Sequence, residues 1–342
     1  MSTESLILAL DFGGTKLAAG LINGDSRKWM ASGRRFSPAN SNATSDIEIM
    51  YELGRSLLKG NKPIAIGVSF GGPVDGKTGV VRLSHHVEGW ENMPLKKMLE
   101  EEFGAIAIVD NDANVAALGE YEYGAGVGSD SLFYITVSTG VGGGWILNGK
   151  PWGGHEGMAG EIGHMVIDPA GPICLCGKKG CVERLASGPY MAKDAKEILK
   201  VAREGNGGRK GEILRSLVGD NLESVTGQLL TQAADMGDKL SQEILHRSAW
   251  ALGVGIGNVA NVVNPKKFIL GGGVTKAGER WWNVVRKTAR ETALPEVNFE
   301  IVAASLGDDA PLWGAVAMAR RLVGEASEAS GRTSVFAPLG DS

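Results

Sequence analysis

The chain has 342 residues, of which 43% are hydrophobic and 22% charged, and 35 basic against 39 acidic side chains leave a formal net charge of −4. These values exclude a largely disordered chain and, at about 150 residues per domain, indicate two domains with a sizeable core. They also argue against a general nucleic-acid or membrane surface, because both need a basic excess. Glycine is the outlier: its 51 residues are about twice the usual share and cluster in turns between apolar runs, which favours ligand contacts through the backbone.

No targeting or membrane segment is predicted. The N-terminus carries Glu4 and Asp11 around a very short apolar stretch and lacks a basic region. Two long uncharged stretches exist, but 131–149 holds five glycines and 248–265 holds three asparagines and a proline, so both are expected in the interior. We therefore expect a cytoplasmic protein.

The first part of the chain predicts alternating strands and helices. A buried strand over 5–11 turns through Gly13-Gly14-Thr15-Lys16 into a second strand, which is the pattern of a β-hairpin. The periodicity of apolar residues then predicts, in order, a helix over 45–59, a strand over 63–70, a helix over 94–103, a strand over 105–110 and a helix over about 112–123.

The second part begins like the first. A strand over 131–137 enters the glycine-rich segment 138–144 and another strand leaves it, about 127 residues after the first hairpin. Two such halves suggest a duplicated architecture with one ligand cleft between two domains. The remainder predicts mostly helix over 184–248, a long helix over 246–263, a strand over 267–270, helices over 275–290 and 309–323, and a mobile or surface-docked polar tail from Gly324.

Three glycine-rich turns are candidate nucleotide-binding segments, namely 13–16, 138–144 and 271–273. Glycines allow backbone N–H groups to approach phosphate oxygens, and the first turn adds the hydroxyl of Thr15 and the cation of Lys16. A plain tight hairpin is the alternative for the first turn, and close packing of a helix is the alternative for the third.

Polar side chains follow the strand over 105–110, where α/β sheets usually hold ligands. Asp112 is expected at the start of a helix, whose dipole favours the ionised carboxylate, and such a group can accept a proton from a substrate hydroxyl. Asn111 can bind a neighbouring hydroxyl. Alternatively, one of these residues is only the helix N-cap.

All three cysteines lie between 174 and 181, which is too few for a disulfide framework. Cys174, Cys176 and Cys181 together with His164 match a tetrahedral zinc site, and four protein ligands make such a site structural. Reduced core cysteines are the alternative. Glu161 lies in a poorly charged stretch before His164, so we expect its carboxylate to pair with polar ligand groups, although surface glutamates are usually only solvated.

The segments DFGGTK, DNDAN, STGVGGG, GEIGH and CLCGKKGCVE, in this order, resemble the ROK family of repressors, open reading frames and sugar kinases, over roughly residues 6–320. The resemblance implies an α/β, actin-like ATPase (hexokinase-type) fold with two α/β domains around a cleft. The boundaries expected from it are 1–118 plus about 306–323 for the first domain, 119–305 for the second, with the zinc loop, and 324–342 for the tail.

The resemblance also implies an activity, ATP-dependent phosphorylation of a hexose hydroxyl, with glucose to glucose 6-phosphate first and an N-acetylmannosamine or N-acetylglucosamine kinase as the alternative. Its cofactors would be ATP with Mg²⁺ and a structural Zn²⁺, and its assembly a homodimer or homotetramer. Asp112 would be the catalytic base. The implied sugar contacts are Gly72, Ser84, His86, Asn111, Asp112, Glu161, His164 and Glu183. The implied nucleotide contacts are Gly13, Gly14, Thr15, Lys16, Thr139, Gly140, Gly272 and Gly273.

Two segments depart from the usual pattern of the family, and alternatives of another class follow. Residues 69–73 replace a Pro-Gly turn and 84–90 replace a Pro-Asn-Leu segment, and both flank the sugar in relatives, so the sugar is open. The family's repressors carry an N-terminal helix-turn-helix, which we do not expect here because the first strand begins by residue 5 or 6. A sugar-sensing protein without catalysis and polyphosphate in place of ATP stay open.

Overall fold

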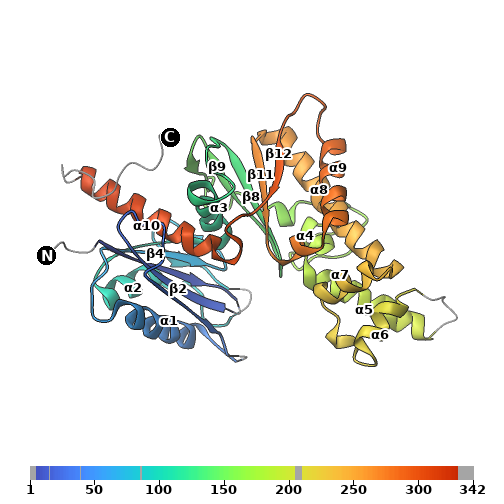
Figure 1. Ribbon diagram of the computed structural model, residues 1–342, viewed down its shortest axis with the longest axis horizontal. Coiled ribbons are helices and arrows are strands. Elements are labelled where there is room, and N and C mark those ends of the chain that lie inside the picture. Colours follow the sequence, from blue (N-terminus) through green and yellow to red (C-terminus); the bar gives the residue numbers. More distant parts are fainter. Residues whose placement is uncertain (1–4, 15, 39, 85–86, 205–209, 330–342) are drawn as a thin grey trace. The chain divides into compact units, whose positions relative to one another are not determined.

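A computed structural model describes residues 5–14, 16–38, 40–84, 87–204 and 210–329 (Figure 1). The chain divides into two compact units, of which unit 1 comprises 1–134, 144–159 and 304–342 and unit 2 comprises 135–143 and 160–303. The domain boundaries expected from the family resemblance, at 118, 119, 305 and 306, stay a prediction. Within the described ranges, no helix is long and apolar enough to cross a membrane.

The first sheet has the strand order β3-β2-β1-β4-β7. Its strands are β1 (Leu6–Phe12), β2 (Lys16–Asn23), β3 (Ala31–Phe36), β4 (Ala65–Phe70) and β7 (Ile106–Asn111). β1 pairs antiparallel with β2, which confirms the predicted hairpin, and β1, β4 and β7 run parallel. The parallel strands bring the ends of β1, β4 and β7 to one edge of the sheet, where polar side chains can meet.

Helices cover both faces of this sheet (Figure 1). They are α1 (Ala43–Leu58), α2 (Leu95–Phe103), α3 (Asp112–Tyr123) and α10 (Ala310–Ala329). Unit 1 also holds a small hairpin of β5 (Val74–Asp75) and β6 (Val80–Val81) and the 3-10 turn η4 (Gly307–Asp309). α1 packs on β2 and β3, and α10 packs on β1 and β4 so closely that a Cβ on Gly67 would lie 1.8 Å from the carbonyl oxygen of Ala315. The core between them is fully buried, for example at Leu8, Leu10 and Met50.

The second sheet has the order β10-β9-β8-β11-β12. Its strands are β8 (Leu132–Val137), β9 (Val141–Leu147), β10 (Lys150–Pro151), β11 (Lys267–Gly271) and β12 (Glu300–Ala303). Three strands that are consecutive in the chain are followed by two later strands, as in the first sheet, and the last two again run parallel. This equivalence is what the two glycine hairpins predict for a duplicated architecture.

The helices of unit 2 pack mostly around one long helix, α8 (Lys239–Val263). The others are α4 (Val182–Ala186), α5 (Gly188–Glu204), α6 (Glu212–Val218), α7 (Gly227–Asp235) and α9 (Glu279–Thr292), with 3-10 turns η1 (Ile162–His164), η2 (Leu222–Ser224) and η3 (Gly273–Lys276). α9 contacts α8 at Gly253 and Gly257, where a Cβ would lie 2.6 and 2.5 Å from the side chains of Thr288 and Thr292. The small residues of α8 therefore permit the close helix packing predicted for them.

Three element boundaries differ from the prediction for identifiable reasons. α9 begins four residues later than predicted, because η3 and Gly278, with φ 84°, intervene. α8 begins at Lys239 because Asp238 caps it, accepting from the N–H of Ser241 at 2.9 Å. α10 continues to Ala329, and residues 330–342 of the predicted tail lie outside the described ranges.

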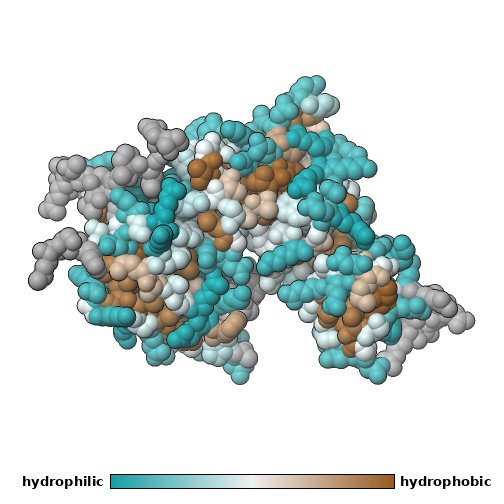
Figure 2. Space-filling model, in the orientation of Figure 1, coloured by the Kyte–Doolittle hydropathy of each residue, from teal (hydrophilic) through white to brown (hydrophobic). Residues whose placement is uncertain are grey.

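On the face drawn in Figure 2, hydrophilic residues cover most of the surface and hydrophobic ones form smaller patches.

Candidate active site and metal centre

The carboxyl end of β7 delivers polar side chains to the start of α3, as the sequence predicts. Asn111 is the N-cap: its Oδ1 accepts from the N–H of Ala113 at 3.0 Å and its Nδ2 donates to the carbonyl of Gly72 at 3.0 Å. Asp112 is the first helical residue, and its Oδ1 accepts from the same N–H at 2.8 Å. The capping alternative thus applies to Asn111, while the half-buried carboxylate of Asp112 at the helix N-terminus stays the candidate base.

A carboxylate that the sequence analysis gave no role, Asp11, lies near the same edge of the sheet. The hydroxyl of Ser69 on β4 donates to its Oδ1 at 2.8 Å. Burial raises the pKa of Asp11 to about 7; the Ser69 hydrogen bond and the charge of Arg34 oppose this shift, and the charge of Asp112 adds to it. A second titratable group therefore accompanies Asp112, and its position directly before the first glycine turn was the only signal for it in the sequence.

The first glycine turn forms a tight hairpin connection. The N–H of Gly13 donates to the carbonyl of Lys16 at 3.0 Å, and a Cβ on Gly13 would lie 2.8 Å from that oxygen. Gly14 lies in the same turn, and the exposed Lys16 ammonium is 3.7 Å from the carboxylate of Asp308. The predicted contact Thr15 lies outside the described residues. The close approach of the Lys16 carbonyl oxygen thus explains why position 13 is a glycine. The phosphate contacts of this turn stay a prediction.

The structure describes the first of the two segments that depart from the family pattern, 69–73, and all of the second, 84–90, except residues 85 and 86. A Cβ on Gly72 would lie 2.7 Å from the carbonyl oxygen of Leu83, so the chain passes too closely there for a larger residue. The hydroxyl of Ser84 accepts from the N–H of Val87 at 3.2 Å. His86 lies outside the described residues. The hydrogen bond between Gly72 and Asn111 brings two of the predicted sugar contacts together.

The second glycine turn closes through a hydrogen bond of 2.9 Å from the N–H of Ser138 to the carbonyl of Gly140. The third turn lies beside it. A Cβ on Gly272 would lie 2.4 Å from the carbonyl oxygen of Val137, whereas one on Gly273 would meet only the Ser138 hydroxyl, at 3.8 Å. Gly272 is therefore required by close approach to β8, while Gly273 leaves open space.

A cavity of about 590 Å³ lies within unit 2 beside these turns. Thr139 and Gly273 both line it, so two predicted nucleotide contacts come together. Its other walls come from α5, η3 and the start of α7, and they include Lys196, Gln228 and Lys276. The sequence analysis missed these three side chains, because neither a glycine cluster nor a distinctive spacing accompanies them. The volume falls within the range of small-molecule sites.

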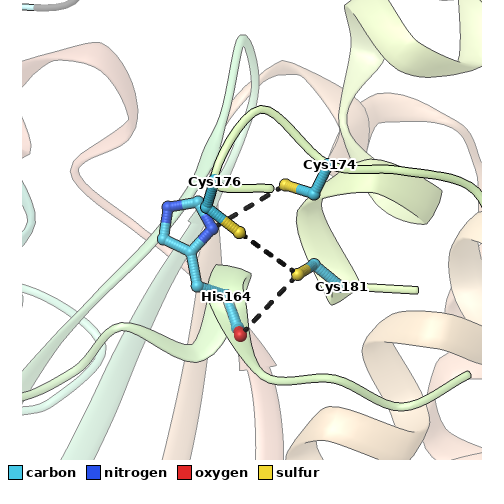
Figure 3. A group of neighbouring side chains, drawn as sticks. All are labelled: His164, Cys174, Cys176 and Cys181. Carbon is cyan, nitrogen blue, oxygen red and sulfur yellow. Dashed lines mark hydrogen bonds between the residues drawn. The ribbon is translucent and has the colours of Figure 1, made fainter. Parts of the chain in front are cut away.

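The predicted zinc ligands converge in unit 2 (Figure 3). One ligand atom from each of His164, Cys174, Cys176 and Cys181 lies within 4.8 Å of all the others. The sulfurs of Cys176 and Cys181 are 3.6 Å apart, and Nδ1 of His164 is 3.9 Å from the sulfur of Cys174. Zn–S bonds of about 2.3 Å and Zn–N bonds of about 2.0 Å give tetrahedral S···S and S···N edges of about 3.8 and about 3.5 Å, so the cluster fits zinc.

The two predicted sugar-binding glutamates of unit 2 have different surroundings. Glu161 is exposed, at the start of η1, and its expected pairing with polar ligand groups stays a prediction. Glu183 on α4 is buried, with 7% of its surface exposed, and its Oε2 accepts from the N–H of Val141 at 2.9 Å. Glu183 thus contacts the second glycine turn, which the sequence analysis did not predict.

A buried ion pair connects α4 to α5. The guanidinium of Arg184 donates to both oxygens of Asp194, at 3.1 and 2.7 Å, and Arg247 donates to the same carboxylate. The Arg184 guanidinium also lies over the ring of Tyr190, whose hydroxyl accepts from the N–H of Leu175 in the cysteine loop at 3.0 Å. These contacts join the metal cluster to the helix that lines the cavity.

The sequence profile of the ROK family matches residues 7–322. This chain belongs to the ROK family. Among its relatives, it is 40% identical to a glucokinase of Halalkalibacterium halodurans, over 74% of this chain and 76% of the relative. It is 34% identical to an N-acetylmannosamine kinase of Shigella flexneri, over 92% of this chain and 98% of the relative.

Solved structures agree with this membership. A ROK glucokinase from Streptomyces griseus in complex with glucose and AMPPNP is 32% identical and aligns with a TM-score of 0.78, over 92% of this chain and 99% of that one. The fold of this ROK protein is therefore that of the ROK sugar kinases, an α/β, actin-like ATPase fold, as its motifs indicate.

Proposed function

We propose that this ROK protein is a sugar kinase that transfers the γ-phosphoryl group of MgATP to a hexose hydroxyl, most simply glucose to give glucose 6-phosphate. The observation that carries this proposal is the carboxylate of Asp112 at the N-terminus of α3, in a chain that is 40% identical to a glucokinase over 74% of its length. The product of such a reaction would enter glycolysis.

In this reaction Asp112 accepts the hydroxyl proton as the sugar oxygen bonds to the γ-phosphorus and the bond to the β-phosphate oxygen breaks, releasing ADP. Asn111 retains one amide hydrogen for a neighbouring hydroxyl, because its cap and its bond to Gly72 use only Oδ1 and one hydrogen of Nδ2. We assign the further sugar contacts to Gly72, Ser84, His86, Glu161, His164 and Glu183.

For the nucleotide we propose the cavity of unit 2, with the phosphates at the turn around Thr139 and Gly140 and the nucleoside near Gly273. The phosphate contacts of residues 13–16 in unit 1 are proposed separately, from the family resemblance. Exposed backbone at Gly273 and the ammonium group of Lys276 suit a polyanionic ligand with a flat base. ATP as donor is supported by the AMPPNP complex of the Streptomyces griseus relative.

Zinc would have a structural role in this reaction, because four protein ligands leave no open coordination position. Bound at Nδ1 of His164, it would fix the ring and leave Nε2 for a sugar hydroxyl. The three cysteines also suit a reducing compartment, which supports the proposal of a cytoplasmic enzyme. For the assembly we propose a homodimer or homotetramer, to be checked by light scattering coupled to size exclusion.

An N-acetylmannosamine or N-acetylglucosamine kinase is the second candidate, supported by the 34% identical N-acetylmannosamine kinase of Shigella flexneri. The test is a coupled ADP-release assay with MgATP and a panel of glucose, mannose, N-acetylglucosamine, N-acetylmannosamine, fructose and allose, with polyphosphate as a second donor. Asp112→Asn should lower kcat by about 100-fold or more on the accepted sugar. Folded, zinc-loaded protein that turns over no sugar with either donor would refute the kinase and favour a sensing protein.

A further inference from the structure

The short segment from Cys181 to Gly188 contacts the second glycine turn on both sides. The N–H of Val141 donates to Oε2 of Glu183 at 2.9 Å, and the N–H of Gly188 donates to the carbonyl of Ser138 at 2.9 Å. Both contacts lie within unit 2. The turn is thus held at its start by a backbone bond and at its end by a carboxylate.

The carboxylate contact is built into the turn. Glu183 is buried, and an N–H···carboxylate bond at this distance is of the strong, charge-assisted kind. A Cβ on Gly140 would lie 2.8 Å from Oε2 of Glu183, so the glycine leaves the room that this oxygen occupies. Gly140 is not in the left-handed region, and this contact explains why no side chain stands there.

The position of this turn determines part of the cavity wall, because Ser138 and Thr139 line the cavity. A backbone N–H that is anchored by a carboxylate loses less freedom when the neighbouring residues bind a phosphate. The Val141 hydrogen bond uses only Oε2 of Glu183, so Oε1 is left as an acceptor for a second hydrogen bond.

We propose that Glu183 is a positioning residue for the nucleotide: through Oε2 it holds the Ser138–Val141 turn in place, and through Oε1, on the proposed function, it binds the sugar. One carboxylate then serves both ligands. Sugar binding at Oε1 fixes the side chain and so favours nucleotide binding, and the reverse holds with the same factor.

The test measures binding of AMPPNP with Mg²⁺ by calorimetry, with and without the sugar that the kinase assay selects. Glu183→Gln keeps the size of the side chain but exchanges a charged acceptor for a neutral one. Gly140→Ala keeps the carboxylate and displaces it from Val141. Glu197→Gln on α5 is the matched control, because that side chain is 61% exposed and forms a surface ion pair with Lys193.

We expect both turn variants to bind AMPPNP about tenfold more weakly than wild type even without sugar, and to lose a sugar-dependent tightening of about tenfold. If Glu183 only contacts the sugar, the Kd of AMPPNP without sugar stays unchanged in Glu183→Gln. If Glu183 acts only through its charge, this Kd falls, because removing a carboxylate reduces the repulsion of the phosphates. The double variant should be no weaker than either single variant if both act through the same contact.

An unchanged or tighter sugar-free Kd in folded Glu183→Gln and Gly140→Ala overturns the positioning role while leaving the kinase intact. Wild-type protein that binds no AMPPNP overturns both the positioning role and the proposed function. Near-ultraviolet circular dichroism and zinc content establish that each variant is folded. If Glu183→Gln is not, an unchanged sugar-free Kd in Gly140→Ala overturns the positioning role by itself.

Discussion

Removing one ligand of the metal cluster is the sharpest perturbation that the structure offers. Cys176 is the exposed member of the set, so Cys176→Ser deletes a thiolate without placing a polar atom in the core. The Cys176–Cys181 sulfur separation of 3.6 Å and the separation of 3.9 Å between Nδ1 of His164 and the sulfur of Cys174 differ by about 0.2–0.4 Å from the edges of an ideal zinc tetrahedron. The cluster is thus preorganised, and we expect one zinc per wild-type chain bound by three sulfurs and one nitrogen.

The size of the effect follows from linkage. A metal present at about a thousandfold excess over its Kd stabilises the folded state by ~4 kcal/mol. For a unit of about 150 residues, such as unit 2, each kcal/mol shifts Tm by ~2–4 °C. Cys176→Ser should therefore lower the Tm of the zinc-loaded protein by about 8–16 °C and reduce its zinc content well below one per chain.

The assay combines elemental analysis, X-ray absorption at the zinc edge and calorimetric unfolding. Lys178→Ser is the matched control, because its side chain lies in the same exposed loop but supplies no metal ligand. The reasoning is refuted if wild-type protein takes up no zinc, if absorption shows an oxygen-dominated shell, or if Cys176→Ser retains a full zinc equivalent and the wild-type Tm.

Two further predictions concern buried charges. Asp194→Ala leaves the Arg184 guanidinium, 6% exposed, without its carboxylate, so urea unfolding should show a loss of about 3–5 kcal/mol in the free energy of unfolding. Glu197→Ala, which removes a surface ion pair, should change this free energy little. Equal losses in the two variants would contradict the role of the buried pair. Asp11 holds its proton up to a pKa of about 7, against an ordinary value of 3.8. The folded state therefore binds more protons than the unfolded state between these values, and the free energy of unfolding falls as pH rises through that window. Asp11→Asn should make the free energy of unfolding depend less on pH in this window. Profiles of wild type and variant that run parallel would contradict the raised pKa of Asp11.

The sequence predicted what depends on residues close together in the chain. The zinc ligands span only residues 164 to 181, and their spacing alone specified a set that the structure brings within 4.8 Å. The polar residues at the end of β7 were also predicted, because a strand followed directly by a helix places Asp112 at the helix N-terminus. Strand and helix types followed from periodicity, and their boundaries shifted by a few residues where caps and 3-10 turns intervene.

What the sequence did not predict depends on contacts between distant segments. The raised pKa of Asp11 requires burial beside Ser69, 58 residues away, and the anchoring of the second turn requires Glu183 to meet Val141, 42 residues away. The cavity walls at Lys196 and Gln228 come from helices whose mutual placement no local pattern encodes. The exposure of Glu161 was likewise not predicted, since uncharged sequence neighbours do not show which way a turn directs a side chain.

The glycine excess has two physical origins that composition cannot separate. At Gly67, Gly314 and Gly272 a Cβ would come within 1.8, 1.7 and 2.4 Å of a backbone oxygen of another element, so these glycines are required for packing whatever the protein binds. Gly273 meets nothing closer than 3.8 Å and faces the cavity, so no packing contact requires it. A glycine that the fold itself does not need, at the wall of a cavity, is the kind that a ligand lying against the backbone explains. By this criterion Gly273 is a stronger candidate for a nucleotide contact than its neighbour Gly272.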